Sequence, residues 1–376
     1  MNKIFLDNNS TTPLDPKVLD SMLPFFLEKF GNSSSKTHYF GWEAEAAVEI
    51  ARQQISELIN CNEDEIIFTS GATESNNLSL QNIINSKKNH IITMATEHKA
   101  ILDVCSYLEK KGIKLSYLRP HNNGIIDLNK LKDSILPQTE LISIMHSNNE
   151  IGVIQPIKEI GELCKKHNIL FHVDAAQSYG KININVKEMN IDLLSISGHK
   201  IYGPKGIGAL YINKKLKINP ILFGGNQEKS IRPGTLPVPL IVGLGTASKI
   251  SKDIMKKESI QILELRNLLI NKIKEKIPDM IINGDIEKRI SGNLNISFPN
   301  LNGQSIVTSL SKIAVSSGSA CTSSIPKPSY VLLNIGLSKR LIQSSIRIGI
   351  GRFNTKNEIL IAADNIIKTV KNKTQF

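Results

Sequence analysis

The stretch ELISIMHSNNEIGVIQPIKEIGELCKKHNILFHVDAAQ, residues 140–177, decides the fold class. An apolar run at residues 140–147 is followed by an amphipathic segment at 157–168 and by a second apolar run at 169–176. Short apolar strands joined by amphipathic helices are typical of a parallel sheet covered by helices on both faces. The stretch therefore predicts a strand–helix–strand unit within an α/β protein.

The same alternation continues on both sides of this unit. Further strands are predicted at residues 65–70, 90–96, 113–118, 193–197 and 208–212. Helices are predicted at residues 72–84, 99–112 and 128–136. From about residue 250 the pattern changes to a long helix at 257–277, strands at 293–298 and 344–350, and a last helix at 357–371. This second pattern predicts a smaller α+β domain.

Composition and charge limit the class of protein. The chain has 376 residues with 40% hydrophobic content, and no apolar run approaches the roughly 20 residues that a membrane span requires. The net charge of +12 comes from lysines spread along the chain without aromatic interleaving, so we expect no direct nucleic-acid binding. We expect no membrane association either, and the four dispersed cysteines without a secretory signal favour a reducing cytoplasm.

Polar residues follow the predicted strands at their carboxyl ends, where parallel sheets bind ligands. The groups are Gly71 to Thr73, Glu97 with His98, Asn148 to Glu150, Asp174 with Gln177, and Ser197 to Lys200. Few kinds of binding site use all of these together. We therefore expect one cofactor-dependent active site at this edge of the sheet.

Three of these groups indicate the chemistry of the cofactor. Gly71, Ala72 and Thr73 open a predicted helix, whose free N–H groups attract an anion such as phosphate, although a plain helix cap has the same pattern. Asp174 directly follows an apolar strand and requires a cationic partner such as the protonated nitrogen of pyridoxal phosphate; capping of the next turn is the alternative. Lys200, between small residues and a Gly/Pro-rich loop, suits a Schiff base with a carbonyl cofactor.

A lone cysteine lies among small polar residues near the C-terminus. In VSSGSACTSS, residues 315–324, seven of the ten residues are Ser, Thr or Gly, and Cys321 lies among them. Free cysteine usually behaves as a small buried hydrophobe, and Cys61, Cys105 and Cys164 fit that habit because they occur in amphipathic helical runs. The setting of Cys321 instead predicts a loop.

Ten ordered motifs show what family the chain is similar to. They are DNNSTTPLDP, GNSSSKTHYFGWEAE, FTSGATESNN, TEHKAIL, NNEIGVIQPI, HVDAAQSYGK, SGHKIYGPKGIGALYI, RPGTLPV, SSGSACTSS and SSIRIGIGRF. With these motifs the chain resembles the cysteine desulfurases of the NifS/IscS type. These are pyridoxal-phosphate enzymes of the aspartate aminotransferase fold (fold type I) within the class-V aminotransferase family. The resemblance runs from Phe5 to about Phe353.

The resemblance implies a role for each matching residue. Lys200 would form the Schiff base with pyridoxal phosphate, Asp174 would pair with the pyridine nitrogen, and Gln177 would contact the ring hydroxyl. His98 would stack on the ring and transfer protons. The phosphate would be held by Ala72, Thr73, Ser197 and His199, and by Thr235 from the partner subunit of a homodimer. Asn149 would contact cofactor and substrate, and Arg347 would bind the substrate carboxylate.

The resemblance also gives Cys321 a function. It would take the sulfur of L-cysteine as a persulfide, leave L-alanine, and pass the sulfur to acceptors such as an iron–sulfur scaffold protein or the enzymes of transfer RNA thiolation. No metal site is implied, beyond a cluster that Cys321 would transiently share with a scaffold. The implied organisation is an N-terminal arm at residues 1–14 joining the small domain, a large cofactor-binding domain at 15–255, and a small domain at 256–376 that carries Cys321.

The chain departs from the family pattern in places, and other functions are compatible with the same residues. The chain has Asn226 and Pro233 in FGGNQEKSIRPGT, where relatives commonly carry Gly and Ser. It ends soon after the last predicted helix, so we expect its scaffold docking to differ from that of relatives with a longer tail. A selenocysteine lyase or an aminotransferase would share the cofactor residues, and a non-catalytic scaffold or regulatory homologue would keep the fold without turnover.

Overall fold

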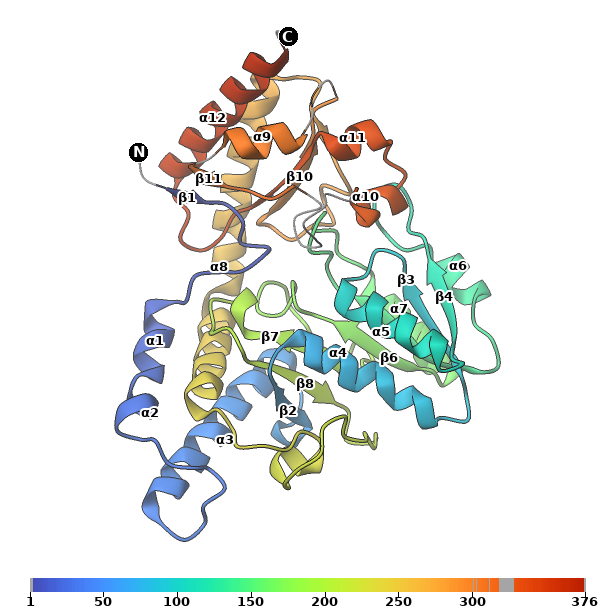
Figure 1. Ribbon diagram of the computed structural model, residues 1–376, viewed down its shortest axis with the longest axis vertical. Coiled ribbons are helices and arrows are strands. Elements are labelled where there is room, and N and C mark those ends of the chain that lie inside the picture. The colour runs from blue at the N-terminus through green and yellow to red at the C-terminus, as the bar shows by residue number, and fades with distance from the viewer. Residues whose placement is uncertain (1–2, 300, 302, 311, 318–327, 375–376) are drawn as a thin grey trace.

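A seven-stranded sheet forms the centre of the larger part of the protein, shown in the computed structural model of Figure 1, which describes residues 3–299, 301, 303–310, 312–317 and 328–374. The strands are β2 (Ile66–Thr69), β3 (His90–Met94), β4 (Lys114–Leu118), β5 (Thr139–Met145), β6 (Leu170–Asp174), β7 (Leu193–Ser197) and β8 (Gly208–Ile212). Their order is β2-β8-β7-β6-β5-β3-β4, and β8 runs antiparallel to both neighbours while the other pairs are parallel. The predicted strands and the mostly parallel mixed sheet are confirmed.

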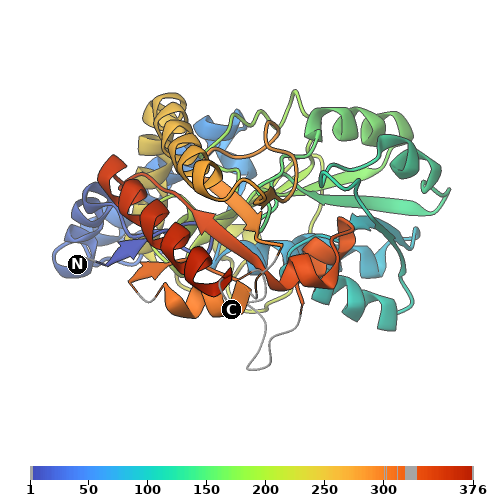
Figure 2. The ribbon, with the colours of Figure 1, turned by 90° about the horizontal axis from the view of Figure 1, so that it is seen from above.

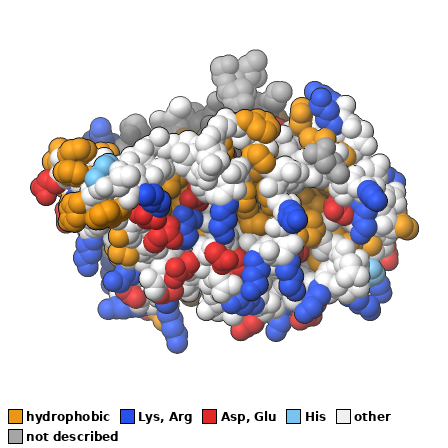
Figure 3. Space-filling model, turned by 90° about the horizontal axis from the view of Figure 1, so that it is seen from below, with side chains coloured by type: hydrophobic (Ala, Val, Ile, Leu, Met, Phe, Trp, Pro, Cys, Tyr) orange, Lys and Arg blue, Asp and Glu red, His pale blue; other side chains and the backbone are white. Residues whose placement is uncertain are grey.

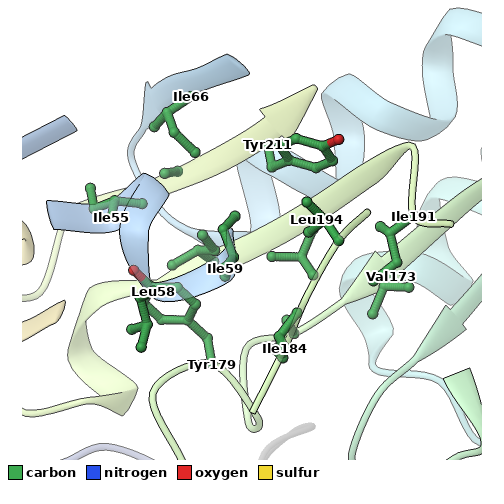
Figure 4. Close-up of a cluster of buried hydrophobic side chains, with 14 of the residues drawn as sticks. Ile55, Leu58, Ile59, Ile66, Val173, Tyr179, Ile184, Ile191, Leu194 and Tyr211 are labelled. Carbon is green, nitrogen blue, oxygen red and sulfur yellow. The ribbon is translucent and has the colours of Figure 1, made fainter. Parts of the chain in front are cut away.

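Helices cover both faces of this sheet because successive side chains along its strands point to opposite faces and are buried on both. Phe68 of β2 faces one core cluster and its neighbour Ile67 faces another. On the first face, Ile55 and Ile59 of α3 belong to the same buried cluster as Leu194 of β7 (Figure 4). The helices of this part are α1 (Pro16–Met22), α2 (Pro24–Leu27), α3 (Tyr39–Ile59), α4 (Ala72–Gln81), α5 (Lys99–Lys110), α6 (Leu128–Asp133) and α7 (Ile157–His167). Short 3₁₀ turns are η1 (Glu63–Glu65), η2 (Asn82–Asn85), η3 (Gly198–Lys200) and η4 (Gln227–Ser230).

Helix α8 (Val238–Lys276) joins the two parts of the protein and begins much earlier than the predicted position 257. Its first half contains glycines that sequence patterns treat as helix breakers. Here they permit close packing, because a Cβ on Gly245 would lie 2.6 Å from the Cα of Ala51 in α3. The helix runs from the large sheet to the C-terminal part of the protein (Figure 1). The proposed domain boundary at 255/256 falls inside α8 and stays a prediction.

The C-terminal part has its own small sheets and core. Strands β9 (Ile281–Ile282), β10 (Asn293–Ser297) and β12 (Ser345–Gly349) form an antiparallel sheet, and β1 (Ile4–Phe5) pairs with β11 (Ile313–Ala314) in parallel. The helices are α9 (Gly303–Ser309), α10 (Tyr330–Asn334), α11 (Lys339–Gln343) and α12 (Lys356–Thr374). Helix α12 lies alongside this small sheet (Figure 2). The predicted strands and last helix of a smaller α+β unit are confirmed. Within the described part of the chain, no helix combines the length and apolar character needed to cross a membrane.

Candidate active site

A cavity of about 490 Å³ opens at the carboxyl ends of β5, β6 and β7. A volume of this size suits a small-molecule cofactor with its substrate. Of the predicted site residues that the structure describes, all except Thr235 line it: Ala72, Thr73, His98, Asn149, Asp174, Gln177, Ser197, His199, Lys200 and Arg347. The cavity therefore brings together residues from both parts of the chain.

Asp174 ends β6 at the inner wall of this cavity with its carboxylate almost fully buried. One carboxylate oxygen accepts a hydrogen bond from the side chain of Asn76 at 2.9 Å, and the other accepts one from the backbone N–H of Ala176 at 2.9 Å. Both donors are neutral, and among the described residues no ion pair compensates the negative charge of this carboxylate. A cationic ring nitrogen in the cavity suits this carboxylate.

Lys200 follows β7 and extends its ammonium toward the N-terminal arm. The Nζ atom donates to the backbone carbonyl oxygens of Asn9, at 2.9 Å, and of Ser10. The same arm holds Gln177, whose Nε2 donates to the Asn9 carbonyl at 2.8 Å and whose Oε1 accepts from the Asn9 side chain at 3.3 Å. The arm therefore positions both the amine and the carboxamide at the cavity wall.

The N-terminus of α4 offers an anion site at one end of the cavity. Its N-cap is Gly71, which has no side chain to occupy the N–H groups of the first turn, where Ala72 and Thr73 lie. His199 lies on the same side, with Nδ1 at 3.0 Å from the hydroxyl of Thr11. Burial, together with nearby lysine ammonium groups, lowers the pKa of His199 to about 4, so its ring is neutral at neutral pH. This end of the cavity suits a phosphate group.

His98 is the N-cap of α5 and lines the cavity. Its Nδ1 accepts a hydrogen bond from the backbone N–H of Ala100 at 3.1 Å, so Nε2 carries the proton of the neutral ring. Desolvation by the cavity walls, with the Lys200 ammonium acting in the same direction and Asp174 opposing, lowers the pKa of His98. The ring is therefore uncharged at neutral pH and available to exchange a proton.

Arg347 of β12 brings a buried positive charge from the small sheet to the cavity. Its Nη2 makes an ion pair with the carboxylate of Asp7 at 2.8 Å and donates to the hydroxyl of Ser316 at 3.2 Å, while Nη1 donates to the carbonyl of Asn149 at 3.2 Å. Among the described residues, Arg347 Nε and the side-chain oxygen of Asn149 are buried without a hydrogen-bond partner. Both atoms therefore have unused hydrogen-bonding capacity in residues that line the cavity.

One predicted site residue that the structure describes is not in this cavity. Thr235 is exposed on the surface and is absent from the cavity lining. Cys321 lies outside the described residues. Of the two substituted positions nearby, Asn226 has an ordinary negative φ of −106°, and Pro233 is buried. A glycine is not required at position 226.

Sequence reasoning missed three residues that hold the predicted ones in place. Asn76 orients Asp174, Asn9 orients Gln177 and Lys200, and Asp7 pairs with Arg347. Asp7 and Asn9 both lie in the motif DNNSTTPLDP, and Asn76 lies in FTSGATESNN, so the motifs contained a signal for them. Their contacts reach across the chain, and nothing in the local pattern names the partner.

Taken together, the described residues fit pyridoxal phosphate. The cavity supplies an uncapped helix N-terminus for a phosphate, a buried carboxylate for a ring nitrogen and a lysine amine for an aldehyde. The unpartnered side-chain oxygen of Asn149 adds an acceptor for the bound ligands.

Comparisons with known proteins agree with this arrangement. The aminotransferase class-V family matches residues 4–361. A cysteine desulfurase IscS of Ehrlichia chaffeensis (strain ATCC CRL-10679 / Arkansas) is 54% identical over 374 residues, covering 98% of this chain and 91% of that protein. Among solved structures, a NifS-like protein has a TM-score of 0.92 at 35% identity, covering 98% of this chain and 100% of that one. The structure of SspA in complex with cysteine has a TM-score of 0.84 at 37% identity, covering 94% and 100%.

The fold, the cavity and these matches define the class of protein. The chain belongs to the aminotransferase class-V family and has the fold of type I pyridoxal-phosphate enzymes. Within that family it groups with the cysteine desulfurases and is a pyridoxal-phosphate-dependent enzyme. The fold class and the cofactor predicted from the motifs are confirmed.

Proposed function

We infer that this protein is a cysteine desulfurase, which removes sulfur from L-cysteine and leaves L-alanine. The observation that carries the inference is the single cavity in which Lys200, Asp174 and Arg347 meet. An amine for the cofactor, a carboxylate for its ring and a guanidinium for an amino-acid carboxylate are the groups that such a reaction requires. The high identity to cysteine desulfurases over nearly the whole chain supports the same activity.

In this proposal, different residues bind different parts of pyridoxal phosphate. When bound, the cofactor supplies an electron sink that stabilises negative charge next to the substrate amino group. Asp174, oriented by Asn76, would keep the ring nitrogen protonated, and the amine of Lys200 would bind the aldehyde carbon. Gln177 would contact the ring hydroxyl. The N-terminus of α4, with Ala72 and Thr73, and the side chains of Ser197 and His199 would hold the phosphate.

Substrate binding and proton transfer are assigned to residues around this cofactor site. Arg347, fixed on one side by Asp7, binds the carboxylate of cysteine, and the unpartnered amide oxygen of Asn149 adds a polar contact. His98 would stack on the ring and would exchange a proton at Nε2, since its lowered pKa leaves the imidazole neutral at neutral pH. The solved structure of SspA in complex with cysteine supports this substrate.

Cys321 is the proposed nucleophile. A new bond forms between its sulfur and the sulfur of the substrate, while the bond from substrate sulfur to carbon breaks and its electron pair remains with the carbon. The other cysteines are unsuited, since burial raises the pKa of Cys61 and Cys105 to about 12 and that of Cys164 further. The small-residue setting of Cys321 favours access to more than one partner.

The proposed assembly is a homodimer in which Thr235 contacts the phosphate of the other subunit. Thr235 is exposed and lies outside the cavity of its own chain, which supports this assignment. Exposed aromatic side chains also gather near the start of α3, among them Phe26, Phe30, Tyr39 and Trp42. Figure 3 shows hydrophobic side chains gathered on the side of the molecule where α1, α2 and the start of α3 lie. Patches of this kind mark protein interfaces.

The sulfur on Cys321 passes to acceptor proteins in this proposal. Iron–sulfur cluster assembly is the main destination, supported by the IscS name of the relatives, and transfer RNA thiolation is a further one. The reducing cytoplasm is the proposed location, and the free state of Cys61, Cys105 and Cys164 agrees with it. No membrane or nucleic acid takes part.

The test is a product assay on the purified protein loaded with pyridoxal phosphate. Addition of L-cysteine with a reductant should yield alanine and sulfide in equal amounts. Formation of the pyridoxamine form of the cofactor would instead indicate an aminotransferase, and activity confined to selenocysteine would indicate a lyase for that substrate. A protein that neither binds the cofactor nor releases a product would be a non-catalytic homologue. The comparisons favour none of these three alternatives.

A further inference from the structure

The turn before Thr235 has a backbone that its side chains disfavour. Glu228, Lys229 and Ser230 are consecutive non-glycine residues with φ of 46°, 58° and 61°. Residues with a Cβ adopt this left-handed region singly, because the Cβ crowds the following carbonyl, and runs of them are rare. Such a run persists only where the surrounding structure imposes it. The turn therefore requires an anchor.

The anchor is the carboxylate of Glu228, which points inward while the rest of the turn is at the surface. Its side chain is 2% exposed. It accepts hydrogen bonds from both Nη atoms of Arg52 in α3, at 2.7 and 3.1 Å, and from the backbone N–H of Phe68 at 2.7 Å. The Arg52 guanidinium is fixed in turn by the carbonyl of Ile66 at 2.6 Å and by the ring of Phe68 at 4.7 Å.

A second contact ties the same segment to the proposed phosphate site. Arg232 donates to the carboxylate of Glu74 in α4 at 2.9 Å, and that carboxylate accepts the backbone N–H of Ser70 at 2.7 Å. Ser70 directly precedes Gly71, the cap of α4. The segment is therefore held at Glu228 and at Arg232, and Thr235 follows as an exposed residue.

We propose that Glu228 is a positioning residue: through the left-handed turn it fixes Thr235 at the surface so that Thr235 contacts the cofactor phosphate bound by a second copy of this chain. This rests on the proposed function, in which Thr235 completes the phosphate site of its partner. The ion pair with Arg52 stabilises a backbone shape that residues 228–230 disfavour on their own. Glu228 touches no cofactor or substrate.

The experiment compares the affinity of the dimeric apoprotein for pyridoxal phosphate with its affinity for pyridoxal, which lacks the phosphate. The ratio of the two affinities isolates the phosphate contacts. We expect Thr235→Ala to lower this ratio roughly 10- to 100-fold, the size of one hydrogen bond to a charged group. Glu228→Gln, which keeps the side-chain volume, should lower the ratio comparably. Glu49→Gln is the matched control, since it removes the exposed second carboxylate on Arg52 and should leave the ratio unchanged.

A second pair of variants tests the turn without removing the partner of a buried charge, in case Glu228→Gln fails to fold. Ser230 is exposed. Ser230→Val places a β-branched side chain at a left-handed position and should lower the ratio, whereas Ser230→Gly accepts that backbone and should leave it unchanged. Combining Glu228→Gln with Thr235→Ala should lower the ratio no further than Thr235→Ala alone, because both changes remove one contact.

The outcomes separate failure of this proposal from failure of the proposed function. If Thr235→Ala lowers the ratio while Glu228→Gln and Ser230→Val do not, the positioning role is overturned. Additive losses in the double variant would also overturn it. If the unaltered protein shows no preference for pyridoxal phosphate, the phosphate site itself is wrongly assigned. If Thr235→Ala alone has no effect, the contact of Thr235 with the partner's phosphate is wrongly assigned. The proposal falls in either case.

Discussion

Lys200 extends its ammonium onto two carbonyl oxygens of the N-terminal arm, within the cavity that fits the cofactor. We predict that Lys200→Ala abolishes covalent attachment of pyridoxal phosphate while Asp174 and α4 still bind it non-covalently. Borohydride reduction followed by intact mass spectrometry checks this, because reduction fixes a Schiff base to the chain. Lys205→Ala is the control, as Lys205 also lines the cavity and its loss should leave the fixed adduct unchanged. An adduct on the Lys200 variant would remove this residue from its role.

The proposed nucleophile gives a second prediction for a single residue. Cys321→Ser should leave cofactor binding unchanged and reduce sulfide and alanine release to background, since a hydroxyl cannot form the persulfide. Cys61→Ser is the matched control, because burial raises the pKa of that thiol to about 12 and it should not react. Both variants are assayed with L-cysteine and a reductant. Full sulfide release by Cys321→Ser would show that the sulfur passes through another group.

Glu150 provides a prediction about pH. Burial raises the pKa of Glu150 from 4.5 to about 7, against the opposing effects of the Ser329 hydrogen bond and the Arg347 charge. The folded state holds this proton more tightly than the unfolded state, so the stabilisation is present below pH 4.5 and is lost as pH rises through 7. Because Glu150→Gln stays neutral, its free energy of unfolding should rise by about 2–3 kcal/mol relative to that of the wild type on going from pH 5 to pH 8. Urea unfolding at both pH values measures these free energies. A difference between variant and wild type that is the same at pH 5 and pH 8 would contradict the prediction.

Site residues could be predicted where their role follows from their place in the chain. Asp174 and Lys200 were predictable because each ends or follows an apolar strand, and parallel sheets collect such residues at one edge. Asp7 was not, because its ion pair with Arg347 joins positions that are 340 residues apart. Long-range polar contacts leave no periodic signal, so the second layer of the site required the structure.

At the scale of elements, strand β8 limits what its first residue can be. Gly208 lies where β8 meets β2 and β7, and a Cβ there would lie 2.3 Å from the Ile196 oxygen and 2.6 Å from the Cα of Gly71. Gly208→Ala should therefore displace the cap of α4, lower the affinity for pyridoxal phosphate and cost about 1–3 kcal/mol of stability.

Equilibrium cofactor binding and denaturant unfolding check both parts of this prediction. Gly112→Ala serves as the control, because a Cβ at Gly112 meets no atom within 4 Å and only its φ of 88° is strained. That control should lose stability and keep its cofactor affinity. An unchanged affinity in Gly208→Ala would show that the cap of α4 does not depend on β8.

The elements themselves were largely predictable, and the exception has a physical cause. Strands buried on both faces appear as short apolar runs, which is why β2, β3 and β5 to β8 match the predicted positions. The first half of α8 was missed because a buried helix has no polar face to set its period, and because Gly243 and Gly245 resemble breaks. Tertiary packing against α3 overrides that local signal.

At the scale of the whole molecule, the exposed aromatic patch gives a prediction about assembly. Phe30 is 68% exposed and stacks on Phe40 at 5.6 Å between ring centroids. We predict that the protein sediments at about 83 kDa, twice the 41.6 kDa of one chain, and that Phe30→Glu shifts it toward 41.6 kDa. Analytical ultracentrifugation measures both. Ile260→Glu changes an exposed hydrophobic residue on α8 and should leave the mass at the dimer value. A dimer that survives Phe30→Glu would place the interface elsewhere.

The single helix α8 has a further consequence for how the chain tolerates insertions and deletions. One residue removed from the middle of a straight helix turns everything beyond it by about 100° and draws it in by about 1.5 Å. Arg347 would then face away from Lys200, even though each sheet could keep its own core. The length of helix α8 thus sets both the distance and the relative rotation of the two halves of one site. Its exposed side chains can vary, but its closely packed glycines and its length between those halves are fixed.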